Sequence, residues 1–358
     1  MSWLIHSAFQ GQASFMTYFV RLETLYRRCD TSIFSAMIAL MLSQVSQFAM
    51  AQSSPTVLPS TQELGAGAGG LGDWNRVIDA EMHQAVEDRG KRWQRDFSSA
   101  ENYRHSIAAK RKRLGNIIGL RDDRVPFGSP TLIATLDSSS LIGTGGDYDV
   151  HRVSWPVFGD VVAEGLLLEP RGRQPFAAVV AVPDCAHTPE QIVGLTEGVP
   201  AESQFARRLA ESGCRVLVPT LVDRTMEVRG KEGYRDYSRQ LMSRREYLFR
   251  PAYMLGRHLI GYEVQQLLAA VDWFSNENQP IGVIGHGEGG MLALYASAVD
   301  ERIEATCVSG YIDSRQMWSE PFDRSVFSCV RDFGDAEFLA MIAPRAIVVE
   351  ACPVMKFN

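Results

Sequence analysis

A surplus of positive charge is missing from this 358-residue sequence, in which 36 lysines and arginines stand against 42 aspartates and glutamates. Because proteins neutralise nucleic-acid phosphates with basic surfaces, this balance argues against a nucleic-acid partner. A glycine-rich phosphate loop followed by Lys-Ser/Thr is also missing, so nucleotide use is not indicated. We therefore expect neither nucleic acid as a partner nor a nucleotide cofactor.

Cysteines are too few and too irregularly spaced for a disulfide scaffold or a zinc site, and we expect no metal or other cofactor. One of the six cysteines lies near the N-terminus in a segment with the features of an export signal, which leaves five that cannot all pair with one another. Cys185, Cys214 and Cys307 lie in or beside apolar runs, where a free cysteine behaves as a small hydrophobic side chain. One disulfide remains the alternative.

The apolar run near the N-terminus, residues 33–42, is shorter than the roughly 20 residues that a bilayer-spanning helix needs. A pair of arginines precedes it, and Ala49 and Ala51 follow at the two positions that a signal peptidase reads. This order predicts a cleaved signal peptide over residues 1–51 and a secreted or periplasmic protein with no stable membrane insertion after cleavage. A buried N-terminal helix is the alternative interpretation.

Low-complexity sequence separates the predicted signal from the rest of the chain. Residues 52–72 are rich in Ser, Pro and Gly, and we expect a flexible linker because this composition buries little apolar surface. Over residues 73–125, apolar residues recur at three- and four-residue spacing after Asp73, a suitable N-cap, which predicts a helical segment. Its basic cluster, Lys110–Arg113, is more typical of a solvated helix face than of a binding patch.

Residues 126–358 are expected to form an α/β domain. Three strand signals, at residues 131–136, 148–155 and 161–168, predict an antiparallel entry to a sheet. Unbroken apolar runs then alternate with helix signals, which predicts a mostly parallel sheet with helices on both faces. The predicted strands of this second part are residues 177–182, 214–218, 281–284, 305–309 and 346–350, and the predicted helices are residues 202–212, 253–274 and 289–298.

One motif should carry the chemistry of the domain. The predicted strand at residues 281–284 runs into Gly285-His286-Gly287-Glu288-Gly289, and an apolar helix follows. A strand, a tight turn and a helix with this glycine spacing are the setting of the G-x-S-x-G nucleophile elbow, in which glycines permit a strained turn and the helix N-terminus stabilises negative charge. Here the nucleophile position is Gly287, which has no side chain.

With this elbow, the chain resembles the α/β-hydrolase superfamily over roughly residues 131–350, and within it the acetyl xylan esterase and dienelactone hydrolase-like branch. Val180-Ala181-Val182-Pro183-Asp184 resembles the third strand and its oxyanion-forming loop, and Ala343-Pro344-Arg345 resembles the start of the penultimate strand. The resemblance implies a serine esterase that acts on a small-molecule or polysaccharide ester.

Two departures from the family pattern put that activity in doubt. Acyl transfer needs a nucleophile at the elbow, and Gly287 supplies none. The resemblance also implies an acid after the penultimate strand and a histidine after the last, whereas residues 352–358 contain neither Asp nor His. We therefore expect a C-terminally incomplete hydrolase domain that lacks the last strand and helix and is inactive or impaired as a serine esterase. The alternatives are a non-catalytic saccharide- or protein-binding module and a fragment of a longer hydrolase.

Five polar residues near the elbow are candidate site residues. Glu288 could act as a substitute nucleophile or base, or it could be a carboxylate favoured by the helix dipole. His286 could be catalytic or a packing residue. Asp184, Cys185 and His187 lie on the predicted oxyanion loop, where they could bind substrate or stabilise the loop.

Other polar residues have alternative interpretations as well. Arg244, Arg245 and Arg250 could bind an anionic sugar, or they could form salt bridges with Glu246 and its neighbours. His258 and Glu263, in the predicted helix over residues 253–274, are expected to satisfy local hydrogen bonds. Trp318 and Phe322 lie where such folds build a lid, and core packing is the alternative for both.

Overall fold

The computed structural model describes residues 71–229, 240–277, 279–312 and 321–350. The chain divides into two compact units, residues 1–73 and residues 74–358, and every described strand lies in the second. The predicted signal peptide and nearly all of the predicted linker lie outside the described residues.

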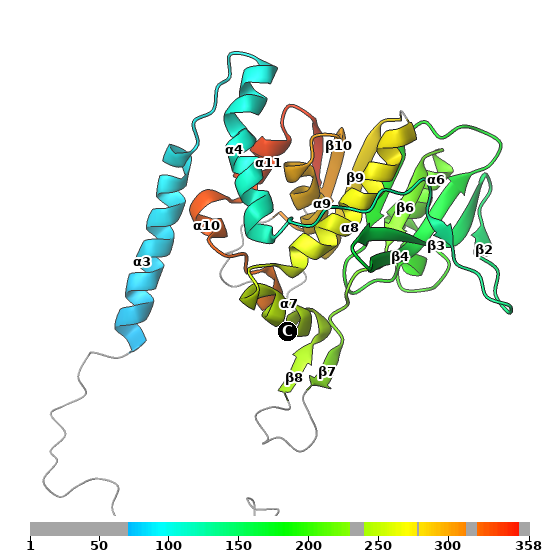
Figure 1. The fold of residues 1–358 in the computed structure, drawn as a ribbon, viewed down its shortest axis with the longest axis horizontal. Coiled ribbons are helices and arrows are strands. Elements are labelled where there is room, and N and C mark those ends of the chain that lie inside the picture. The colour runs from blue at the N-terminus through cyan, green and yellow to red at the C-terminus, as the bar shows by residue number, and fades with distance from the viewer. Residues whose placement is uncertain (1–70, 230–239, 278, 313–320, 351–358) are drawn as a thin grey trace, which may run out of the picture. The chain divides into compact units, whose positions relative to one another are not determined.

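A mostly parallel sheet, nine-stranded within the described residues, forms the centre of the second unit (Figure 1). Its strands are β1 (Thr131–Leu132), β2 (Leu141–Thr144), β3 (Tyr148–Phe158), β4 (Val161–Pro170), β5 (Ala178–Val182), β6 (Arg215–Pro219), β9 (Ile281–His286), β10 (Ala305–Ser309) and β11 (Ala346–Glu350). The strand order is β1-β3-β4-β6-β5-β9-β10-β11, with β2 beside β3. Strands β1 to β4 pair antiparallel with their neighbours, and the remaining strands are parallel to one another. The predicted α/β class with antiparallel entry strands is confirmed.

Strand β5 shows how the sequence builds a core on each face of the sheet. All five of its residues are buried. Ala178, Val180 and Val182 point into one core, with α4 (Ala100–Ile118), α8 (Leu259–Phe274), α9 (Glu288–Val299) and α11 (Asp335–Ile342). Val179 and Ala181 point into the other, with α5 (Pro189–Ile192) and α6 (Phe205–Glu211). An unbroken apolar run suits this position because side chains alternate between two covered faces.

The helix predicted over residues 253–274 is wrong as a single element, because α7 (Arg244–Met254) ends before α8 begins. Gly256 adopts a left-handed backbone with φ 67°, which closes α7. His258 then caps α8, since its Nδ1 accepts a hydrogen bond from the backbone N–H of Ile260 at 3.1 Å. A stop signal and a start signal therefore lie within three residues, inside an otherwise continuous helical pattern.

Several strand boundaries also differ from the prediction. Strand β1 covers only the first two residues of the predicted 131–136 segment. Strand β3 continues through Pro156, because the register shifts between Pro156 and Phe158 and such a bulge tolerates a residue without an N–H. Strand β2 and the hairpin of β7 (Met226–Arg229) and β8 (Gln240–Ser243) were not predicted.

The predicted helical segment over residues 73–125 consists of α3 (Leu71–Arg89), which begins before the predicted N-cap Asp73, and of α4. The expected solvated face on α4 is only partly present, because Lys112 and Arg113 are exposed whereas Lys110 and Arg111 are partly buried. Lys110 and Arg113 both pair with Asp332, at 3.0 and 2.6 Å. Arg111 donates to the backbone carbonyl of Ala298 at 3.0 Å, and only 11% of its side chain is exposed. These bonds join α4 to α9 and to α10 (Cys329–Asp332), segments that lie about 200 residues away in the sequence.

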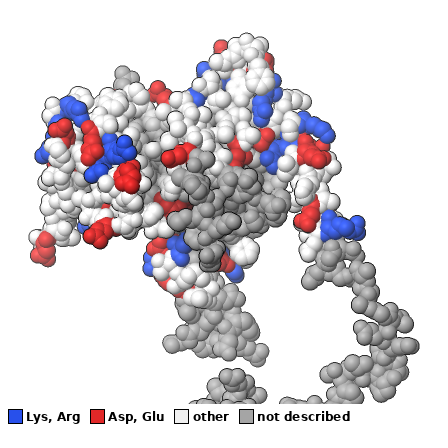
Figure 2. All heavy atoms as spheres, turned by 180° about the vertical axis from the view of Figure 1, so that it is seen from behind, with Lys and Arg blue, Asp and Glu red and all other residues white. Residues whose placement is uncertain are grey.

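Three further expectations can be compared with the described residues. No helix among them is long and apolar enough to cross a membrane. The four described cysteines are free; Cys185 and Cys214 are buried as predicted, whereas Cys307 is only partly buried, and Cys352 lies outside the described residues. The third expectation is the lack of a basic surface for nucleic acid, and on the face of the molecule in Figure 2 acidic and basic side chains are intermingled.

Candidate functional site

The predicted strand–turn–helix is present at the centre of the sheet. Strand β9 ends at His286, Gly287 turns with φ 56° and ψ −117°, and α9 begins at Glu288. A Cβ on Gly285 would collide with the backbone carbonyl of Gly289, and a Cβ on Gly289 would collide with that of Val182. The flanking glycines are therefore required by close backbone approach.

The carboxylate of Asp184 lies where the side chain of a nucleophile would begin. A Cβ built on Gly287 would collide with Oδ2 of Asp184. The same Oδ2 accepts a hydrogen bond from the backbone N–H of Glu288 at 2.8 Å, and Oδ1 accepts one from the backbone N–H of Ala186 at 2.8 Å. Asp184, one of the predicted loop residues, thus fills the vacant position and occupies a backbone donor of the elbow.

The side chain of Glu288 points away from this position, into the protein. It is fully buried, and its Oε2 accepts bonds from Arg224 at 3.0 Å and from Arg324 at 2.6 Å. Its Oε1 accepts a bond from Arg245 at 3.2 Å. A carboxylate held by three guanidinium groups in the interior is not placed to attack a substrate, so the geometry argues against Glu288 as a substitute nucleophile.

These contacts are part of a buried ion network, in which Arg245 is the central residue. Arg245 has no exposed surface and makes two 2.7 Å bonds to Glu263 and one of 2.8 Å to Asp323. Burial raises the pKa of Glu263, whereas bonds from Arg224 and Arg245 overcome the effect of burial on Asp323 and lower its pKa. The network fixes α7, α8 and the start of α9 against one another.

All three arginines form salt bridges, but only Arg250 has the expected partner Glu246. Arg250 pairs with Glu246 at 2.6 Å, four residues away on α7. Arg244 pairs with Asp223 and Glu227, and Arg245 joins the buried network instead. Sequence spacing finds the pair within one helix, but it cannot find partners that only folding brings together.

A cavity of about 570 Å³ opens beside the elbow, at the carboxyl ends of β5, β9, β10 and β11. This edge is where open α/β sheets bind their ligands. Its lining residues are Asp184, His187, Ile192, Gly198, Val199, Pro200, Glu202, Ser203, Phe205, Arg208, Ile284, Gly285, His286, Ser309 and Glu350. The predicted site residues Asp184, His187 and His286 are thus brought together, whereas Glu288 and Cys185 are not in the lining.

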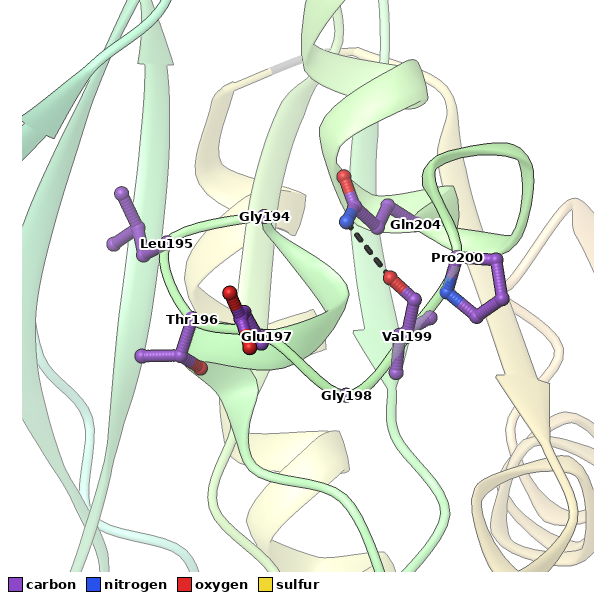
Figure 3. A pocket seen from close by; sticks show the side chains of 8 residues that line it. All are labelled: Gly194, Leu195, Thr196, Glu197, Gly198, Val199, Pro200 and Gln204. Atoms are coloured by element: carbon purple, nitrogen blue, oxygen red, sulfur yellow. Dashed lines mark hydrogen bonds between the residues drawn. The ribbon is translucent and has the colours of Figure 1, made fainter.

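The loop over residues 194–200 forms one wall of this cavity and also borders a shallower pocket (Figure 3). Gly198, Val199 and Pro200 line both hollows. Gln204 donates a 2.9 Å hydrogen bond from Nε2 to the carbonyl of Val199, drawn as a dashed line in Figure 3. The bond holds the loop against the start of α6.

Three neighbouring strand ends form a hydrogen-bonded chain in the cavity wall. The hydroxyl of Ser309, at the end of β10, donates to Oε2 of Glu350 at the end of β11, at 2.6 Å. Nδ1 of His286, at the end of β9, lies 3.0 Å from the same hydroxyl oxygen. Ser309 and Glu350 were not predicted as site residues. Both end strands that the sequence identifies, and carboxyl ends of adjacent parallel strands meet at one sheet edge, so this signal could have found them.

The remaining predicted site residues lie in different surroundings. Cys185 is buried beside Asp184, and burial raises the pKa of its thiol to about 12, so the thiolate is not formed near neutral pH. His187 lines the cavity, and its backbone N–H donates to the carbonyl of Asp184 at 2.9 Å. His258 caps α8 and Glu263 pairs with Arg245. Phe322 is 68% exposed, and Trp318 lies outside the described residues.

Comparison with solved structures identifies the fold. A candidate acetyl xylan esterase from Bacteroides fragilis matches with a TM-score of 0.55 and 14% identity over 82% of this chain and 77% of its own. A methylesterase matches with a TM-score of 0.50 and 16% identity over 76% of this chain, which spans about half (55%) of that protein. The protein has an α/β-hydrolase fold. Searches with family models and among curated proteins gave no match.

The α/β-hydrolase fold also explains the position of the cavity. In this fold the elbow and the carboxyl ends of the central strands share one edge of the sheet, and the cavity beside Gly287 lies at that edge. At these identities the two structures support the fold alone.

Proposed function

We propose that this α/β-hydrolase-fold protein keeps an esterase-type cavity as a binding site for a small-molecule or saccharide ligand and does not perform serine acyl transfer. The observation that carries the proposal is the carboxylate of Asp184, which fills the space next to Gly287 and accepts the backbone N–H of Glu288. Export through the predicted signal peptide is part of the proposal, and N-terminal sequencing of the secreted protein would test it.

Acyl transfer requires both a nucleophile and donors for the oxyanion, and the arrangement of Asp184 works against each. Gly287 offers no nucleophile, and the N–H that would stabilise an oxyanion is already bonded to a negative charge. A second negative charge developing there would be repelled by that carboxylate.

Substitute nucleophiles are poorly placed as well. Cys185 is buried and protonated. Ser309 lies at the end of β10 and not at the elbow, whose backbone N–H would stabilise an oxyanion. Glu288 is held by arginines. These positions favour binding without turnover.

The test is to incubate the purified protein with p-nitrophenyl acetate and to measure both nitrophenolate release and intact mass. We expect no burst and no acetyl adduct, and the same result for Gly287→Ser, because Asp184 occupies the space that its side chain needs. Gly287→Ser/Asp184→Gly removes that obstruction and is the matched comparison. An acetyl adduct on the unmodified protein, with turnover that saturates, would overturn the proposal.

A further inference from the structure

The charges around the cavity are unequal. Asp184, Glu202 and Glu350 contribute three carboxylates, and Arg208 contributes the one guanidinium among the lining residues. One of the hydrogen-bond donors of Arg208 is already occupied, because its Nη1 donates to the backbone carbonyl of Glu202 at 3.1 Å. The cavity therefore has a negative potential that disfavours an anionic ligand.

The hydrogen-bonded chain through Ser309 sets the tautomer of His286. A hydroxyl has one proton, and that of Ser309 is donated to Glu350, so the contact with His286 requires an Nδ1–H that donates to the hydroxyl oxygen. In the neutral ring, Nε2 then carries no proton and is an acceptor. Nε2 has no hydrogen-bond partner within the described residues, and His286 lines the cavity.

Hydrogen-bond acceptors thus dominate the polar part of the cavity lining, and the rest of the lining is apolar. The carboxylates of Asp184 and Glu350 and the Nε2 of His286 all accept hydrogen bonds, and Phe205 and Ile284 supply apolar surface. A volume of about 570 Å³ is within the range of small-ligand sites. The complementary ligand is rich in hydrogen-bond donors, carries no negative charge and has one apolar face.

We infer that the cavity binds a polyhydroxylated ligand that bears an ammonium group, with the chemistry of an amino sugar, and rejects the corresponding uronic acid. This inference rests on the proposed function and specifies its ligand class. Hydroxyl and ammonium groups donate to the acceptors around His286, and the sugar ring packs on the apolar wall. The positive charge is attracted by the carboxylates that would repel a uronate.

Glucosamine, glucose and glucuronate share one ring and differ in charge, so they form a matched set of probes for titration calorimetry or ligand-observed NMR. At low salt we expect glucosamine to bind about fivefold to tenfold more tightly than glucose, and glucuronate to bind more weakly than glucose, as one contact between exposed unit charges gives an effect of this order. Glu350→Gln should reduce the preference for glucosamine by about fivefold. Glu304→Gln is the matched control, because Glu304 is exposed next to the opposite end of β10.

Ser309 acts here as a positioning residue, and ¹⁵N NMR of the His286 imidazole reports on it directly. The spectrum should show the Nδ1–H tautomer in the unmodified protein and a mixture of tautomers in Ser309→Ala, at an unchanged melting temperature. Equal affinities for the three sugars, no binding of any of them at tens of millimolar, or the Nε2–H tautomer would each overturn the inference. An acetyl adduct in the ester assay would instead overturn the proposed function, so the two failures are distinguishable.

Discussion

Replacing Arg245 by methionine should destabilise the fold far more than the same replacement of Arg250, the exposed arginine of α7. Arg245 has no exposed surface, and methionine keeps much of its volume while removing the charge. The substitution removes both guanidinium bonds to Glu263, whereas Asp323 and Glu288 keep bonds to Arg224 and, for Glu288, to Arg324. One buried carboxylate is therefore left without its cation.

Breaking a buried pair in this way costs about 3–5 kcal/mol of unfolding free energy, because the remaining charge stays in the interior without compensation. The matched control is Arg250→Met on the same helix. The Arg250 side chain is 53% exposed and pairs with Glu246 across one helical turn, a geometry that contributes about 0.5 kcal/mol or less. The two variants remove the same charge from the same helix and differ mainly in burial.

Equilibrium unfolding in urea measures both variants, and Arg245→Met/Glu263→Gln completes the set. Removing the orphaned charge together with its partner should recover part of the loss. If Arg245→Met cost no more than Arg250→Met, the interpretation of the network as a buried, mutually dependent set of charges would be refuted.

The same variant should have a characteristic pH dependence. Burial raises the pKa of Glu263 above its ordinary value of 4.5, and Arg245 opposes this effect. Without Arg245, the folded state binds a proton at Glu263 that the unfolded state has already released above pH 4.5, so the variant loses stability as pH rises through that window. The difference from the unmodified protein should grow from pH 4.5 towards neutrality and should vanish in the Glu263→Gln background.

Two further predictions concern helix α8. Burial lowers the pKa of His258 from its ordinary 6.5 to about 4, so the unfolded state binds the extra proton between these values. The unfolding free energy should therefore fall by about 3 kcal/mol as pH falls from 6.5 to 4. His258→Asn keeps a capping acceptor, and it should remove this pH-dependent loss of stability in urea titrations at several pH values. Gly261→Ala should lower the unfolding free energy by about 1–3 kcal/mol, because its Cβ would collide with the backbone carbonyl of Ile118 on α4. Gly90→Ala is the control and should change stability little, because the space around Gly90 is open. Equal effects in thermal unfolding would contradict the close packing of α4 on α8.

The sequence supported predictions well where the signal is local. Strand β5 is a run of apolar residues stopped by Pro183, and the elbow is a fixed spacing of glycines around Gly287. Each follows from steric limits and side-chain alternation within a few residues. The break between α7 and α8 was missed because the capping signals at Gly256 and His258 lie inside a pattern that continues with helical periodicity.

The predicted site was incomplete for a different reason. Asp184 was identified on its loop, but its bond to the backbone N–H of Glu288 joins residues 104 positions apart. The same is true of Arg245, which the sequence places near Glu246 and the fold places on Glu263 and Asp323. Charged side chains reach several partners, and spacing along the chain does not select among them.

By itself, the sequence determined the alternation of the central strands with helices, the elbow and the missing nucleophile, because backbone sterics and apolar periodicity act over short stretches. Only the tertiary structure decided which group fills the space beside Gly287, where the charge of Glu288 is compensated, and that Ser309 links His286 to Glu350. Those outcomes depend on the free energy of burying polar groups, which is favourable only when partners from distant segments arrive together in the folded core.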